Sequence, residues 1–249
     1  MSPPLTRRHA LALSATASAL LAGLASAQPQ GLSPMTHIVL LGDSVFDNAP
    51  YVAAGQEVVE QLRRSLLPGW QATLLARDGA MLAGVHDQAR RVPADASHLF
   101  VSAGGNDGLG WTPLFGERVT SVAEALTRLA SVRREFEARY RAMLDEVLGL
   151  GRPTTICTIY DVRFPDPALR EVAITALTLL NDVITREAGR RGLPLLDLRV
   201  LLDDDADFAN PIEPSAEGGQ KLAAAILDVV KHHDFAQPRS TVFATPGPG

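Results

Sequence analysis

The chain has 249 residues, 46% of them hydrophobic, and a formal net charge of −5 at pH 7. This length and composition are typical of one α/β domain with a substantial core. An acidic chain without a basic stripe is a poor nucleic-acid binder, so we expect no nucleic-acid partner. Cys157 is the only cysteine, which excludes an intramolecular disulfide, and its apolar surroundings indicate a small buried core residue.

Residues 1–27 have the pattern of a cleaved export signal. A basic start at 6–9 contains Arg7-Arg8, a weakly apolar run covers 10–25, and Ala25-Ser26-Ala27 is a small-residue cleavage site. The arginine pair is compatible with twin-arginine export. The apolar run is shorter than the roughly 20 residues that a spanning helix needs. We therefore expect a periplasmic or secreted protein with no stable membrane span after signal removal.

The rest of the chain alternates short apolar runs with longer amphipathic ones. Such alternation predicts a parallel sheet covered by helices on both faces. We expect a single domain over 28–236 and a flexible tail over 237–249, which is rich in Pro and Gly. The fold class is therefore α/β, a three-layer α/β/α sandwich of flavodoxin-like type with about five parallel strands. In chain order the predicted elements are strand 36–41, helix 50–67, strand 71–76, helix 82–92, strand 97–102, helix 117–149, strand 154–160, helix 167–191, strand 194–198 and helix 215–231.

Polar and glycine-rich segments follow these strands, and the carboxyl ends of parallel strands meet at one edge of a sheet. Gly42-Asp43-Ser44 follows the first strand, where a turn exposes a serine and the next helix offers backbone N–H groups. Ser44 is therefore a candidate nucleophile, although Asp43 and Ser44 are also common helix caps. Gly79 and Asn106 follow the second and third strands. With the Ser44 amide they are candidate oxyanion donors, or else residues that serve turns and caps.

With these segments the chain resembles the GDSL, or SGNH, hydrolases, a family of serine esterases and acyl hydrolases. Gly42-Asp43-Ser44, Gly79 and Gly105-Asn106-Asp107 match the first three sequence blocks of that family, in order. The resemblance covers essentially all of the domain. It implies that Ser44 is the nucleophile, that the Ser44 amide, Gly79 and Asn106 form the oxyanion hole, and that no cofactor or metal is needed. The serine lacks the Gly-x-Ser-x-Gly frame of the α/β-hydrolases.

The last block of the family pattern is altered. Members of the family usually have Asp-x-x-His before the final helix, whereas this chain has Asn210 and Glu213 at those positions. A carboxylate can take the serine proton, but its ordinary pKa is about two units below that of histidine unless burial or neighbouring carboxylates raise it. Asn210 would suit Glu213 as a hydrogen-bond donor. His86, near the second block, is a weak alternative base.

The sequence thus favours hydrolysis of a small-molecule carboxylic ester through a Ser44 acyl-enzyme, with Glu213 as base. One alternative is a weakly active or inactive periplasmic protein that binds an acylated sugar or lipid. A third interpretation, phosphoester hydrolysis with Asp43 as nucleophile, lacks the usual second aspartate. The side chains of Trp111 and Phe115 either line a pocket or pack against the core. The sequence leaves the oligomeric state open.

Overall fold

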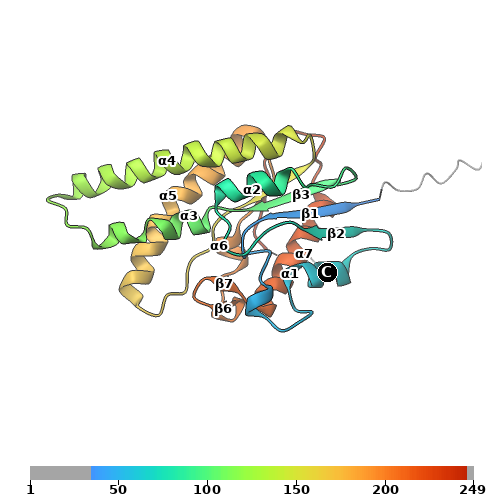
Figure 1. The fold of residues 1–249 in the computed structure, drawn as a ribbon, viewed down its shortest axis with the longest axis horizontal. Coiled ribbons are helices and arrows are strands. Elements are labelled where there is room, and N and C mark those ends of the chain that lie inside the picture. Colours follow the sequence, from blue (N-terminus) through green and yellow to red (C-terminus); the bar gives the residue numbers. More distant parts are fainter. Residues whose placement is uncertain (1–34, 246–249) are drawn as a thin grey trace, which may run out of the picture. The chain divides into compact units, whose positions relative to one another are not determined.

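The computed structural model describes residues 35–245, so the predicted export signal at 1–27 lies outside the described residues. A six-stranded parallel sheet forms the centre, with the strand order β2-β1-β3-β4-β5-β8 (Figure 1). Its strands are β1 (His37–Gly42), β2 (Gln71–Leu74), β3 (His98–Ser102), β4 (Thr154–Cys157), β5 (Leu195–Leu196) and β8 (Val242–Phe243). All pairings are parallel, so the segments that follow the strands meet at one edge.

Helices cover both faces of the sheet, and side chains that alternate along each strand form the two cores. One core joins Val39, Leu99 and Ile156 to three helices, and the other joins Ile38, Leu40 and the remaining helices. The first face carries α2 (Leu82–Ala89), α4 (Val122–Gly149) and α5 (Pro167–Arg191); the second carries α1 (Val58–Ser65), α6 (Leu198–Leu201) and α7 (Ala216–His232). The predicted three-layer α/β/α sandwich is therefore confirmed.

The short elements sit mostly at the edge where the parallel strands end. They are the helix α3 (Gly105–Gly110), the 3₁₀ turns η1 (Ala49–Tyr51), η2 (Thr112–Gly116) and η3 (Asp205–Asp207), and the antiparallel pair β6 (Phe208–Asn210) and β7 (Glu213–Pro214). These elements are too short to produce a periodic hydrophobic pattern, so the sequence did not predict them.

The chain end differs from the expected flexible tail. Val242 and Phe243 pair with Leu195 and Leu196 and add a sixth, edge strand to the sheet. The sequence did not predict this strand, because it is only two residues long and stands in a segment rich in Pro and Gly. Its partner β5 is equally short. Phe243 also packs against the core behind α7.

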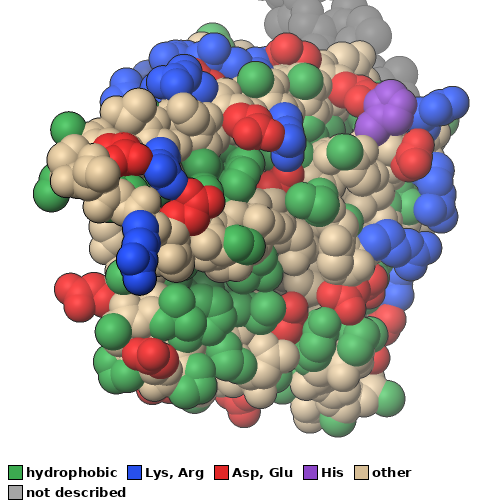
Figure 2. Space-filling model, turned by 60° about the vertical axis from the view of Figure 1, so that its left-hand side comes forward, with side chains coloured by type: hydrophobic (Ala, Val, Ile, Leu, Met, Phe, Trp, Pro, Cys, Tyr) green, Lys and Arg blue, Asp and Glu red, His purple; other side chains and the backbone are tan. Residues whose placement is uncertain are grey.

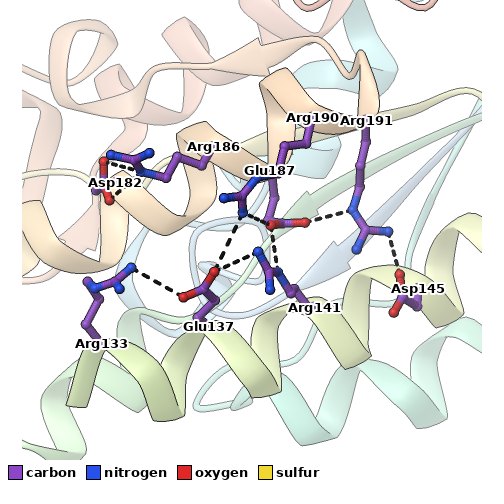
Figure 3. A network of polar contacts seen from close by, with 9 residues as sticks. All are labelled: Arg133, Glu137, Arg141, Asp145, Asp182, Arg186, Glu187, Arg190 and Arg191. Atoms are coloured by element: carbon purple, nitrogen blue, oxygen red, sulfur yellow. Dashed lines mark hydrogen bonds and ion pairs between the residues drawn. The ribbon is translucent and has the colours of Figure 1, made fainter. Parts of the chain in front are cut away.

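Helices α4 and α5 are joined by a cluster of charged side chains centred on Glu187 (Figure 3). Its carboxylate accepts hydrogen bonds from Arg141, Arg190 and Arg191 at 2.8, 2.8 and 2.9 Å. The Glu187 side chain is only 3% exposed. Burial acts to raise its pKa, but the three guanidinium groups outweigh burial and hold the pKa at about 2.

We expect Glu187→Gln to lower the free energy of unfolding at pH 7 by about 2 kcal/mol, since the charge-assisted hydrogen bonds are lost. The folded-state pKa is depressed from 4.5, so this contribution is fully present above pH 4.5 and is lost as the pH falls towards about 2. Urea denaturation at pH 7 and pH 3 measures both effects. The control Glu135→Gln, in an exposed pair with Arg139, should change little. Equal losses in the two variants would contradict the structural importance of Glu187.

Candidate active site

Ser44 lies in the turn directly after β1, at the edge where the parallel strands end. Gly42 makes this turn possible: its φ is +124°, and an added Cβ would lie 1.7 Å from the carbonyl oxygen of Ser102. The backbone N–H of Asp43 donates to that same oxygen at 3.0 Å, which ties the turn to β3. No residue with a side chain fits at position 42, so the turn that presents Ser44 depends on glycine.

An apolar cavity opens beside Ser44. The space between its lining residues, including the part that is open to solvent, is about 970 Å³. Ser44, Asp43, Asn106 and Glu213 line its polar end. The remaining wall is mostly hydrophobic and comes from α3, η2, α4, α5 and the loop before α5, including Trp111, Leu114, Phe115, Leu129, Val132, Phe164, Leu177 and Leu180. Trp111 and Phe115, for which the sequence left two interpretations, line this cavity.

Glu213 reaches the same cavity from the β6–β7 hairpin, and several hydrogen bonds to main-chain oxygens hold this hairpin in place. Asn48 donates through Nδ2 to the carbonyl of Pro214 at 3.2 Å and accepts from the backbone N–H of Val58. The Tyr160 hydroxyl donates to the carbonyl of Ile212, and the backbone N–H of Arg163 donates to the carbonyl of Pro211 at 2.7 Å. Contacts from three parts of the chain therefore place residue 213 opposite Ser44.

The Glu213 carboxyl group is buried and faces Ser44. Its Oε2 atom has no hydrogen-bond partner within residues 35–245. Burial raises the pKa of Glu213 to about 7; hydrogen bonding to the Ser44 hydroxyl opposes this rise, and the negative charge of Asp78 adds to it. Asp78 is itself held by the Tyr51 hydroxyl, which donates to both of its carboxylate oxygens at 3.0 Å. Glu213 is thus a stronger base than an ordinary glutamate.

Asp43 is a second carboxyl group with a raised pKa. Burial raises its pKa to about 7, and the charges of Glu213 and Asp107 add to the rise, while a hydrogen bond from the Val45 backbone N–H opposes it. A carboxyl group that is 4% exposed and partly protonated at neutral pH is a poor nucleophile. The environment of Asp43 therefore disfavours the phosphoester interpretation.

Two of the three predicted oxyanion donors, Ser44 and Asn106, line the cavity, and Gly79 does not. The Ser44 backbone N–H makes no hydrogen bond within the described chain. The Asn106 amide donates to the carbonyl of Ala80 at 2.9 Å, which leaves its second amide hydrogen for another acceptor. Gly79 is exposed and does not line the cavity, although its neighbour Ala80 contacts Asn106. The oxyanion role of Gly79 stays a prediction.

Asn210 does not make the predicted contact with Glu213. Its Oδ1 atom accepts the backbone N–H of Ile212 at 2.9 Å and so stabilises the turn between β6 and β7. The backbones of Asn210 and Glu213 pair across the hairpin. The expected hydrogen bond is absent from the structure: the Asx turn uses Oδ1 and fixes the orientation of the Asn210 side chain, and its amide NH₂ group makes no bond to Glu213. Asn210 affects Glu213 only through the shape of the hairpin.

His86, the alternative base that the sequence offered, lies away from the cavity. Its ring pairs with Glu146 between α2 and α4, the side chain is 54% exposed, and it does not line the cavity. No histidine of residues 35–245 lines the cavity. Cys157 is buried, and burial raises the pKa of its thiol, so it is an inert core residue. Among the acidic side chains of residues 35–245, Asp43 and Glu213 line the cavity together with Ser44.

Sequence reasoning missed the residues that support the site: Asn48, Asp78 and Tyr160. Asn48 and Asp78 follow predicted strands and Tyr160 ends the predicted strand 154–160, near the edge where the strands end, so their position was a usable signal. Their partners are main-chain atoms or residues far away in the sequence, which no local pattern identifies. The described part of the chain contains no group of three or more His, Cys, Asp or Glu side chains arranged to hold a metal ion.

Comparison with known proteins agrees with this geometry. The family model described as the GDSL-like lipase/acylhydrolase family matches residues 40–221. A lipolytic protein of the G-D-S-L family from Veillonella parvula is 17% identical with a TM-score of 0.58, and the match covers 80% of this chain and 100% of that one. An extracellular lipase from Streptomyces rimosus is 17% identical (TM-score 0.57; 78% and 98% covered). A phospholipase A1 from Streptomyces albidoflavus is 16% identical (TM-score 0.58; 79% and 98%). No curated protein matches the sequence at a significant level.

Ser44 follows the first strand of an α/β/α sandwich and lies beside an apolar cavity. Together with the family match, this arrangement places the protein in the general class of ester hydrolases. The family match covers well over half of the sequence, and the chain belongs to the GDSL-like lipase/acylhydrolase family. The solved structures share the fold over about four fifths of the chain. None of the helices within 35–245 combines the length and the hydrophobicity that crossing a bilayer requires.

Proposed function

We propose that this chain hydrolyses carboxylic esters through a covalent acyl-enzyme on Ser44, with Glu213 as the general base. The observation that carries the proposal is the meeting of the two side chains at the polar end of one cavity, with Asn106 beside them. Family membership supports ester hydrolysis in general. The use of a glutamate where the family has a histidine is the specific feature of this site.

The reaction follows from this arrangement. Ionised Glu213 takes the proton of the Ser44 hydroxyl as Oγ attacks the ester carbonyl carbon. The negative charge that develops on the carbonyl oxygen is stabilised by the Ser44 backbone N–H and the Asn106 amide, together with the Gly79 N–H as a predicted third donor. The tetrahedral intermediate collapses, and protonated Glu213 returns its proton to the leaving alkoxide. A water molecule then gives a proton to Glu213 as it attacks the acyl carbonyl carbon; the bond to Oγ breaks, Glu213 returns the proton to Oγ, and the carboxylic acid is released.

The raised pKa of Glu213 allows a glutamate to act as the base in place of the histidine of the family pattern. A general base is most effective when its pKa lies near the working pH. An ordinary glutamate, with a pKa near 4.5, would be ionised but weakly basic at neutral pH; burial here brings the value to about 7, close to that of histidine. The environment of residue 213 therefore compensates for the weaker base.

The apolar wall of the cavity indicates the acyl part of the substrate. The side chains beyond Ser44 are mostly aromatic or aliphatic, among them Trp111, Phe115, Phe164 and Leu180, and they offer few polar groups for a sugar. Burying methylene groups against such a wall is favourable. We therefore place an aliphatic acyl chain in the cavity and the alcohol part towards its mouth. Export of the protein, suggested by residues 1–27, remains part of this proposal and is compatible with a lipase described as extracellular among its structural relatives.

The pH dependence of p-nitrophenyl butyrate hydrolysis tests the proposal. Because ionised Glu213 is the active form, kcat/KM should rise with pH and level off above about pH 7, unlike the profile of an unperturbed carboxylate. Asp78→Asn removes a negative charge that raises the pKa of Glu213, so the rising limb should move to lower pH. Asp182→Asn, in an exposed pair with Arg186, is the control and should leave it in place.

The same preparation should form a stable adduct with a fluorophosphonate at Ser44, seen as a mass shift of the peptide that contains it. A chain that binds esters without cleaving them would show neither a pH-dependent rate nor the adduct. A profile that levels off near pH 5 would contradict the raised basicity of Glu213.

A further inference from the structure

The apolar stripe that α4 presents to the core continues beyond the region that other elements cover. Phe136 and Tyr140 are buried against the sheet, and Leu129 and Val132, one to two turns earlier, line the cavity. The next positions on the same helical face lie at the beginning of the helix and are solvent-exposed: Leu126 is 60% and Val122 76% exposed. Val119 precedes the helix and is also exposed.

Helix α5 repeats this pattern. Leu180 and Leu177 line the cavity, whereas Val172 and Leu169, in the first two turns of the helix, are 47% and 40% exposed. We call Val119, Val122, Leu126, Leu169 and Val172 the apolar rim. The first turns of α4 and α5 extend past the sheet on the side where η2 lies, at the left in Figure 1. Figure 2 views this side and shows hydrophobic side chains among scattered charged ones.

The charges near the apolar rim are largely paired with one another. Arg128 contacts Glu117 and Glu124, and Arg133 contacts Glu137. This neutral pairing gives the rim little attraction for a strongly charged partner. On α4 and α5 the rim residues lie within about two helical turns of side chains that line the cavity, such as Leu129 and Ala176.

We infer that the apolar rim docks onto an uncharged or zwitterionic lipid surface, from which an ester lipid enters the cavity. This inference rests on the proposed function, because the occupant of the rim is the aggregated form of the proposed substrate. Exposed aliphatic side chains at the ends of two helices insert among the head groups, and the gain grows with the apolar area removed from water. Most monomeric proteins avoid contiguous apolar patches unless they serve an interaction.

Co-sedimentation with phosphatidylcholine vesicles tests the inference, using the full chain with Ser44→Ala so that no lipid is consumed. We expect this protein to bind, and Leu126→Asp and Val172→Asp each to weaken partitioning at least tenfold. The matched controls are Leu67→Asp and Val200→Asp, both 49% exposed and outside the rim, which should bind as before. In the Ser44-containing chain, Leu126→Asp should leave hydrolysis of monomeric p-nitrophenyl butyrate within threefold.

Absence of vesicle binding by the Ser44→Ala protein overturns the inference, as does an equal loss in the control variants. Dimers seen by light scattering that Leu126→Asp dissociates, without vesicle binding, would assign the rim to a second copy and overturn it as well. Vesicle binding that depends on Leu126 and Val172 in a chain that fails to hydrolyse esters would leave the docking surface standing and overturn the proposed function instead.

Discussion

Ser44→Ala should lower kcat/KM for p-nitrophenyl butyrate by roughly 10³-fold or more, because the acyl-enzyme cannot form without the Oγ atom. The cavity, the oxyanion donors and Glu213 remain, so residual catalysis comes only from substrate binding and charge stabilisation. The substitution removes one atom from a side chain that is 6% exposed, and the turn around it is fixed by Gly42 and Ser102. The fold is therefore expected to persist.

Initial rates at pH 8 measure this loss, and thermal unfolding followed by circular dichroism verifies the fold. Ser65→Ala, on α1, is a matched control: its hydroxyl contacts only the carbonyl of Gln61, and activity should be unchanged. A Ser44→Ala protein that keeps more than a tenth of the wild-type rate would contradict the role of Ser44 as nucleophile.

Glu213→Gln should lower kcat/KM by about 10²- to 10⁴-fold at pH 8, which is the usual contribution of a general base. The amide has nearly the same shape as the carboxyl group but accepts no proton. Glu213→His should retain activity within about tenfold of the wild type, since main-chain hydrogen bonds hold the backbone at this position and an imidazole has a suitable pKa.

Steady-state rates of the two variants, with thermal unfolding as a check on the fold, separate chemistry from stability. Glu171→Gln, an exposed glutamate on α5, should behave as the wild type. A Glu213→Gln protein with full activity, while Ser44→Ala is inactive, would exclude Glu213 as the base and direct attention to Asp43, the other ionisable carboxyl group on the cavity wall.

The sheet and the long helices could be predicted from the sequence because their patterns are local. Residues 38–41 are apolar without interruption, as is typical of a strand buried on both faces, and the predicted helix 167–191 begins and ends where α5 does. Val242–Phe243 could not be predicted, since a two-residue strand has no period and forms only because β5 offers an open edge.

The candidate site likewise has one part that the sequence predicted and one part that it did not. Ser44, Asn106 and Glu213 were predicted from their positions after strands or in the last block, and the structure brings all three to one cavity. The contact of Asn210 was wrong because side-chain hydrogen bonds depend on turn geometry that the sequence does not specify. The size of the pKa shift of Glu213 could not be predicted from the sequence either, because it depends on burial and on the charge of Asp78, which is far away in the sequence.

The hairpin that carries Glu213 is held through the carbonyl groups of Pro211, Ile212 and Pro214, and through none of the side-chain atoms of residue 213 itself. The scaffold therefore fixes where a proton acceptor stands without fixing which acceptor it is. An exchange between histidine and glutamate at position 213 therefore needs no change in Asn48, Tyr160 or Arg163, which hold the hairpin. The proposed base thus differs from the family pattern while the support of its backbone needs no alteration.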